Sequence, residues 1–114
     1  MSALYIVAQR YIPHLLSLAK TDSAKPAFIV TSSLLPKQPI PEVFALSLVK
    51  AAQRNLMQSL DMTYGGKGVH IGVINVAGEV SPESKERSPK RIAQVTWDWS
   101  ERASRGTREF EVDV

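Results

Sequence analysis

The stretch Ala27-Phe28-Ile29-Val30-Thr31 is a short run of apolar and β-branched residues without polar alternation. Such a run is typical of a strand that is covered on both faces, as in a parallel sheet. A second run of this kind spans residues 69–76, and a long helical pattern at residues 42–62 lies between the two. A strand, a helix and a strand in this order predict a right-handed βαβ unit. The predicted fold class is therefore α/β.

A further helix is predicted before this unit, because apolar residues recur at helical spacing over residues 4–19. Pro13 lies inside this segment, removes a backbone hydrogen bond and crowds the preceding turn, so we expect a bend or a break there. After the βαβ helix, Tyr64-Gly65-Gly66 supplies a C-terminal stop.

The last third of the chain predicts helical starts and an edge strand. Ser81-Pro82 and Ser88-Pro89 each place an N-cap residue before a proline suited to the first helical position. The second pair opens a helix with Trp97 and Trp99 on different faces, so we expect one of them in the core and one at an interface. After Gly106, apolar and acidic residues alternate over residues 109–114, which predicts an edge strand with its acidic side chains outward.

Composition indicates one soluble domain that spans residues 1–114. The chain is 44% apolar and 22% charged, which is typical of a globular protein. Its net charge of +3 comes from scattered basic residues, so nucleic-acid binding is not expected. No long apolar segment predicts a membrane span, and the absence of cysteine excludes disulfides and favours the cytoplasm.

The segment Phe28-Ile29-Val30-Thr31-Ser32-Ser33, followed by Lys50 within residues 45–52, resembles the active-site stretch of short-chain dehydrogenases/reductases. Further resemblances in the same register carry the match over nearly the whole chain; they lie at residues 11–16, 69–78 and 88–93. The resemblance implies the C-terminal half of that fold. We therefore expect a partial Rossmann-like three-layer sandwich, a short parallel sheet with flanking helices that lacks the N-terminal nucleotide-binding half.

The resemblance also implies roles for particular residues. In the family, a serine at the strand end polarises the substrate carbonyl, and a tyrosine four residues before a lysine passes the proton. The lysine lowers the pKa of the tyrosine and holds the ribose of the cofactor. Ser33 matches the serine and Lys50 the lysine, as catalytic and cofactor-binding positions, but Leu46 stands at the tyrosine position and has no proton to give.

The cofactor site is incomplete by the same resemblance. The family's glycine-rich turn, which seats the pyrophosphate on a helix N-terminus, is absent, and alignment through Pro13 puts the family's catalytic asparagine just before Met1. Ala77 also stands where the family's turn begins with proline. We therefore expect no NAD or NADP binding by this chain alone, and binding only where a partner completes the site.

Three functions remain open. The leading hypothesis is a truncated short-chain-dehydrogenase-like protein that acts by association with itself or with a full-length relative. The alternative is a non-redox isomerase or dehydratase that uses a remnant pocket around Ser33, Ser47 and Lys50, with Tyr5 or Tyr64 as proton donor. The third is a fragment of an NAD(P)-dependent oxidoreductase.

Association is expected through two surfaces. The strand at residues 27–31 has an apolar edge, without lysine or proline, that a neighbouring strand would cover in the family. Helices 4–19 and 42–62 correspond to a family interface between two subunits, so we expect a homodimer or a larger assembly. On the helix at residues 42–62, four apolar residues are assigned to this interface, and a separate row of four residues is assigned to the face that packs on the sheet. The interface residues are Phe44, Leu48, Met57 and Leu60, and the stripe is Leu46, Val49, Gln53 and Leu56.

Three other motifs are weak. Ser47-Leu48-Val49-Lys50 matches the Ser-x-x-Lys pattern of acyl-transferring enzymes, but the companion motifs are missing. Gly65-Gly66-Lys67-Gly68 resembles a phosphate loop, but here helix precedes and strand follows, the reverse of the required order. His14 and His70 have no partners at metal-ligand spacing, so no metal site is predicted.

Overall fold

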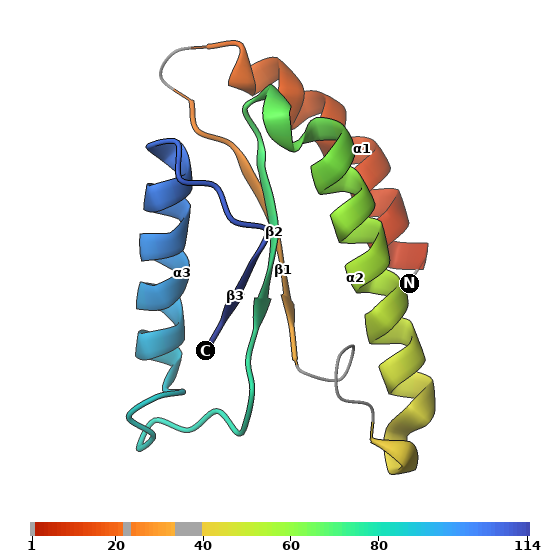
Figure 1. The fold of residues 1–114 in the computed structure, drawn as a ribbon, viewed down its shortest axis with the longest axis vertical. Coiled ribbons are helices and arrows are strands. Elements are labelled where there is room, and N and C mark those ends of the chain that lie inside the picture. The colour runs from red at the N-terminus through yellow and green to blue at the C-terminus, as the bar shows by residue number, and fades with distance from the viewer. Residues whose placement is uncertain (1, 22–23, 34–39) are drawn as a thin grey trace.

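The computed structural model describes residues 2–21, 24–33 and 40–114. The elements are α1 (Ser2–Ala19), β1 (Ala27–Ser32), the 3-10 turn η1 (Pro41–Val43), α2 (Phe44–Tyr64), the 3-10 turn η2 (Gly65–Lys67), β2 (His70–Asn75), α3 (Pro89–Ser104) and β3 (Glu111–Asp113). Helices α1 and α2 cover one face of the sheet and α3 covers the other (Figure 1). The predicted three-layer α/β architecture is confirmed. Among the described residues no helix combines the length and the apolar character that a membrane span needs.

The sheet has the order β1-β2-β3, and both pairings are parallel. Ala27 pairs with His70 and Ser32 with Asn75, so β1 and β2 are in register along their whole length. All six residues of β2 are buried, as expected for a central strand that is covered on both faces. Within the described part of the chain, β2 is the only strand neighbour of β1, so the other edge of β1 is open.

The core has two parts, one on each face of β2. On the α1 and α2 face, Ala8 and Ile12 meet Met57, Val69, Ile71 and Val73. On the α3 face, fully buried Trp99 fills the space over Gly72, where an added Cβ would lie 2.6 Å from the Trp99 ring and from the Phe110 carbonyl oxygen. Trp97, on the opposite face of α3, is exposed. The prediction that one of the two tryptophans lies in the core is therefore confirmed. The prediction that the other lies at an interface stays a prediction.

Element boundaries agree with the sequence signals, with two exceptions. Ser88 caps α3 by accepting a hydrogen bond from the Arg91 N–H at 3.1 Å, and Gly68 takes the positive φ that ends the turn after α2. The helix α1 continues through Pro13, so of the predicted bend or break, the break is wrong. The missing proline N–H removes one backbone hydrogen bond without ending the helix. Ser81-Pro82 forms a turn, not a helix start, with the Ser84 N–H donating to the Ser81 carbonyl at 3.1 Å.

The sheet-facing stripe of α2 differs from the predicted one. Met57 is fully buried in the core, whereas Leu46 and Val49 are exposed. The stripe that faces the sheet includes Lys50, Arg54, Met57, Asp61 and Tyr64, with Ser47 buried at its start. Arg54 can occupy this stripe because its stem packs toward the sheet while its guanidinium reaches Glu111 at the sheet edge. Met57 is therefore not an interface residue, contrary to the prediction.

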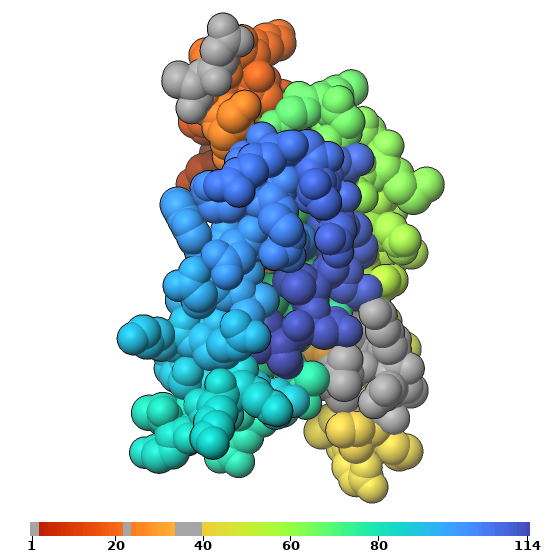
Figure 2. Space-filling model, turned by 60° about the vertical axis from the view of Figure 1, so that its left-hand side comes forward, coloured from red at the N-terminus to blue at the C-terminus, as the bar shows by residue number. Residues whose placement is uncertain are grey.

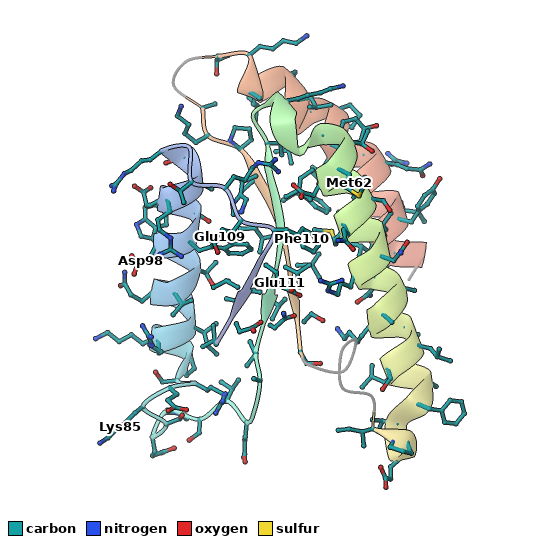
Figure 3. All side chains as sticks on the ribbon, in the orientation of Figure 1. Met62, Lys85, Asp98, Glu109, Phe110 and Glu111 are labelled. Atoms are coloured by element: carbon teal, nitrogen blue, oxygen red, sulfur yellow. The ribbon has the colours of Figure 1, made fainter. Side chains whose placement is uncertain are left out.

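The acidic residues of β3 do not all face outward as predicted. Glu111 is half-buried and lies between β3 and α2 (Figure 3), where it pairs with Arg54. In a parallel sheet, side chains in register point to the same face, so Glu111 shares the α2 face with Val73. A basic partner on the covering helix makes this burial of a carboxylate tolerable.

Candidate functional site

The predicted site residues gather at the carboxyl end of the sheet. Ser33 directly follows β1, whose last carbonyl, that of Ser32, accepts a hydrogen bond from the Val76 N–H at 3.0 Å. Helix α2 begins at this same end (Figure 1), so Ser47 and Lys50 in its first two turns lie there too. Carboxyl ends of parallel strands are where open α/β sheets bind their ligands. Residues 34–39, which join β1 to η1, lie outside the described residues.

The side chains at this end differ in exposure. Ser47 is buried, and its Oγ finds no hydrogen-bond partner among the described residues. Lys50 is half-buried and follows Ser47 by three residues, so both lie on one side of α2. Leu46, at the position of the family's tyrosine, is exposed and offers no polar group.

A polar network that the sequence did not predict lies beside these residues. Arg54 donates from Nε to Glu111 Oε2 at 3.0 Å and from Nη2 to Oε1 at 3.2 Å. Asn75 Nδ2 donates to Glu111 Oε2 and to Asp113 Oδ1, both at 2.8 Å. Hydrogen bonding to Glu111 raises the pKa of Arg54 above its ordinary value. The network ties α2 to the ends of β2 and β3.

Asn75 is the network's central residue, and one of its two side-chain polar atoms takes no part in the network. It is 1% exposed, and its Oδ1 finds no partner among the described residues. An unpaired buried acceptor costs about 1–3 kcal/mol, which a ligand or a water can recover. The signal in the sequence was a single asparagine closing a buried strand at the carboxyl end of a parallel sheet, a position at which ligand-binding residues gather.

The surface is hollowed beside the Asn75 network and again along the second half of α2; Figure 2 shows the molecule from the side of α3 and β3. One hollow, of about 410 Å³, is bordered by Lys85, Arg91 and Asp113, and Asp113 links it to the Asn75 network. The other, of about 450 Å³, is an apolar groove between α1 and α2, with Tyr5, Ile12 and Leu56 among its walls. Within the described residues, no group of three or more His, Cys, Asp or Glu side chains could hold a metal ion.

Comparison with solved structures identifies the fold. Acetoin dehydrogenase YohF from Salmonella typhimurium matches 99% of this chain and 50% of its own, with a TM-score of 0.69 and 19% identity. An NADPH-bound short chain oxidoreductase from Pseudomonas aeruginosa PAO1, with an atypical catalytic center, matches 91% of this chain and 39% of its own, with a TM-score of 0.54 and 25% identity. No family model matches the sequence. No curated protein matches it either.

These likenesses confirm the predicted fold. The chain has the partial Rossmann-like architecture of short-chain dehydrogenases and spans half or less of the solved structures that it matches. Ser33 and Lys50, which the resemblance singled out, and Ser47, which the alternative function adds, lie at the carboxyl end of the sheet, while their roles stay predictions.

Proposed function

We propose that this chain supplies the substrate-side half of a short-chain dehydrogenase fold and acts in the cytoplasm by association with a second copy or with a full-length relative. On this proposal it does not transfer hydride unaided. The open edge of β1 carries the argument, because β1 is a strand of a parallel sheet with a neighbour on one side only within the described residues. Unpaired strand edges of this kind bind further strands.

The outer faces of α1 and α2 give further support. Large apolar side chains are exposed on both helices, including Tyr5, Ile6 and Tyr11 on α1 and Phe44, Leu48 and Met62 on α2. Tyr5 also lines the apolar groove between the helices. Large apolar side chains exposed together on one side of a protein are typical of protein–protein interfaces.

The absence of hydride transfer by the chain alone is supported by two sequence features. Leu46 cannot donate a proton where the family has tyrosine, and no glycine-rich turn is present to seat a pyrophosphate. NAD or NADP would then bind only when an associated chain supplies the missing half. The NADPH-bound structure of the Pseudomonas protein makes NADPH the nucleotide to test first.

The decisive experiment is a titration of NADPH, and then of NADH, followed by nucleotide fluorescence. We expect no saturable binding to the purified chain. Saturable binding should appear only when a full-length short-chain dehydrogenase is added as partner. The mixture should then bind more nucleotide than the partner binds alone. Micromolar binding to the isolated chain would overturn the proposal and favour a self-sufficient oxidoreductase.

A non-redox isomerase or dehydratase is a second candidate, favoured by one observation. The buried Ser47 hydroxyl, without a partner among the described residues, lies one turn from the Lys50 amine. A hydroxyl and an amine on one helix face can exchange a proton with a bound substrate. Turnover of hydroxyacyl substrates without added nucleotide, lost in Ser47→Ala and Lys50→Met, would establish this activity, and its absence from the native chain would exclude it for those substrates.

A further inference from the structure

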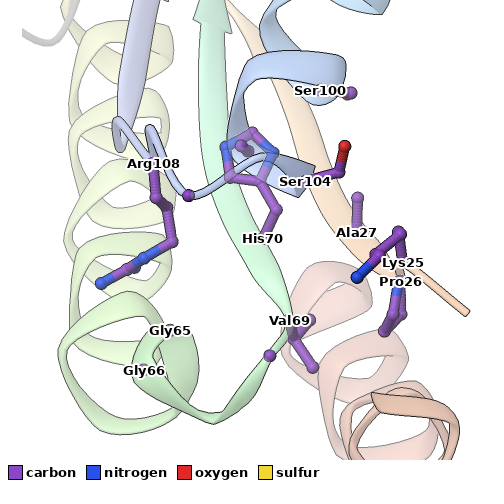
Figure 4. A pocket seen from close by; sticks show the side chains of 13 residues that line it. Lys25, Pro26, Ala27, Gly65, Gly66, Val69, His70, Ser100, Ser104 and Arg108 are labelled. Atoms are coloured by element: carbon purple, nitrogen blue, oxygen red, sulfur yellow. The ribbon is translucent and has the colours of Figure 1, made fainter. Parts of the chain in front are cut away.

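The open edge of β1 carries backbone groups that pair with no strand in the described part of the chain. On the other edge, the carbonyl groups of Pro26 and Ser32 accept hydrogen bonds from β2, that of Pro26 from the His70 N–H at 3.0 Å. Figure 4 shows this amino end of the pair, with Pro26 and Ala27 on β1 beside His70 on β2. Neighbouring residues of a strand direct their backbone groups to opposite edges, so the odd-numbered residues of β1 face outward. They are Ala27, Ile29 and Thr31.

This spacing fits a second copy of the same strand. In an antiparallel pair, two residues that face each other exchange both of their hydrogen bonds, and such pairs recur at every second residue. Three such pairs form when Ile29 lies opposite the partner's Ile29 and Ala27 lies opposite the partner's Thr31. A register shifted by two residues would leave one end residue opposite a residue outside β1. The strand contains no charged residue and no proline that would oppose this pairing.

Helix α1 lies on the β1 side of the helix layer. Arg54 of α2 reaches Glu111 of β3, so α2 covers the side of the sheet away from β1. Tyr5 and Gln9 of α1 face α2, because they line the groove between the two helices together with Leu56. The opposite side of α1 therefore points along the layer toward the open edge of β1.

That side of α1 carries a row of residues suited to pairing with another helix. The row follows the spacing i, i+4, i+7 and i+11, which is the spacing of a coiled-coil seam. It lies roughly half a turn around α1 from Tyr5 and Gln9. All of its members are exposed, and none is an acid, a lysine or an arginine. The row consists of Val7, Tyr11, His14 and Leu18.

We propose that a second copy of this chain covers the open edge, with the two β1 strands antiparallel about a two-fold axis at Ile29. The inference rests on the proposed association through β1 and names its occupant. The axis is perpendicular to the sheet, so both α1 helices lie on one face and run antiparallel. Val7 then meets the partner's Leu18, and Tyr11 meets the partner's His14, with which it can share a hydrogen bond. Both surfaces are complementary to themselves, as a two-fold interface requires.

The absence of cysteine lets one introduced thiol report on the strand pair. Ile29→Cys should give a disulfide-linked dimer under mild oxidation, because the facing Cα atoms would lie about 5.5 Å apart, within the range of a disulfide. Thr31→Cys is the matched control on the same strand. It is more exposed, but the two copies of residue 31 would lie about 14 Å apart and should stay unlinked.

Ala27→Cys combined with Thr31→Cys should restore the link, since these two positions face each other in the proposed register. Both residues are exposed, so this double variant decides should Ile29→Cys fail to fold. Electrophoresis without reductant reads all three variants. Linkage of Thr31→Cys alone to the same extent as Ile29→Cys would overturn the register and with it the proposal.

Tyr11→Glu tests the row on α1. It should raise the dimer dissociation constant about tenfold or more, because it places a charge in an apolar contact. Met62→Glu makes the same change at an α2 residue that is 82% exposed and lies outside both surfaces, so it should leave the dimer intact. Sedimentation of the full chain measures both.

Two results would overturn the proposal and leave the proposed association standing. One is a dimer in which neither Ile29→Cys nor the double variant becomes linked. The other is a dimer that Met62→Glu dissociates and Tyr11→Glu does not. A chain that sediments only as a monomer would also overturn the proposal, and would leave association with a full-length relative as the proposed function.

Discussion

Arg54 of α2 and Glu111 of β3 form a two-point ion pair that links the helix layer to the edge of the sheet. The guanidinium also lies 5.6 Å from the centre of the Phe110 ring. Both side chains are largely shielded from solvent, at 27% and 17% exposure. Pairs of this kind are worth more than surface ion pairs because removal of one partner leaves the other charge shielded from solvent without its counter-ion.

Arg54→Leu should therefore lower the free energy of unfolding by about 1–3 kcal/mol. Arg105→Leu is the control, because Arg105 pairs with Glu101 on the exposed surface of α3, where such pairs contribute about 0–1 kcal/mol. Urea denaturation measures both. Equal losses in the two variants would contradict the assigned role of the Arg54–Glu111 pair.

Gly72→Ala should destabilise the chain because the new Cβ would collide with Trp99 and with the Phe110 backbone. Overpacking of this kind costs about 1–3 kcal/mol. Gly66→Ala adds the same methyl group where nothing lies within 4 Å, so it should be nearly neutral. The difference between the two thermal midpoints tests whether Trp99 sits over β2 as described.

The pKa of His70 should lie below its ordinary value of 6.5, chiefly because burial penalises the charged ring. Arg108 lowers it further, while the Glu109 carbonyl and Asp61 oppose the shift. The unfolded chain then binds more protons than the folded one between the folded pKa and about 6.5, so stability falls as pH falls through that window. An NMR titration of the ring measures the pKa. Unfolding curves should lose this pH dependence in His70→Phe, and a folded pKa at or above 6.5 would contradict the prediction.

Leu48→Glu should dissociate an assembly built on the outer face of α1 and α2, since Leu48 is 65% exposed. Met57→Glu should instead unfold the chain, because Met57 is fully buried and a carboxylate there has no partner. Sedimentation at low micromolar concentration measures the dissociation expected of Leu48→Glu. Circular dichroism of the same samples detects the unfolding expected of Met57→Glu. Thr107→Glu, on an exposed turn, controls for the added charge. A native chain that sediments only as a 12.6 kDa monomer would refute self-association.

Leu46→Tyr restores the family's proton donor at an exposed position one turn before Lys50. We expect no NADPH-dependent turnover of carbonyl substrates by this variant alone, because a proton donor without a bound hydride donor completes no reduction. Absorbance at the nucleotide band follows the reaction. Turnover that depends on both NADPH and the new tyrosine would show that the chain holds a nucleotide unaided.

The sequence predicted the βαβ unit well because a buried parallel strand and its crossover helix each leave a contiguous pattern. It failed for the sheet-facing side of α2, where Arg54 and Asp61 occupy positions that a search for apolar residues passes over. The Asn75–Glu111 contact was also out of reach, since it depends on the register between β2 and β3, which are far apart in the chain. Elements formed by residues near one another in sequence could be predicted. The polar contacts between elements could not, because they depend on how the helices and strands are arranged in three dimensions.

The all-parallel pairing of β1, β2 and β3 has a consequence for how the chain reaches its folded state. Ala27 pairs with His70 and Val73 with Glu111, so no two strands can meet as a hairpin and each pairing must close a loop of roughly forty residues. Such non-local pairing slows folding, so β2 should spend longer as an apolar segment without neighbours than a hairpin strand would. In that interval it is open to wrong partners. Refolding yield should therefore fall as protein concentration rises, even where the final fold is stable.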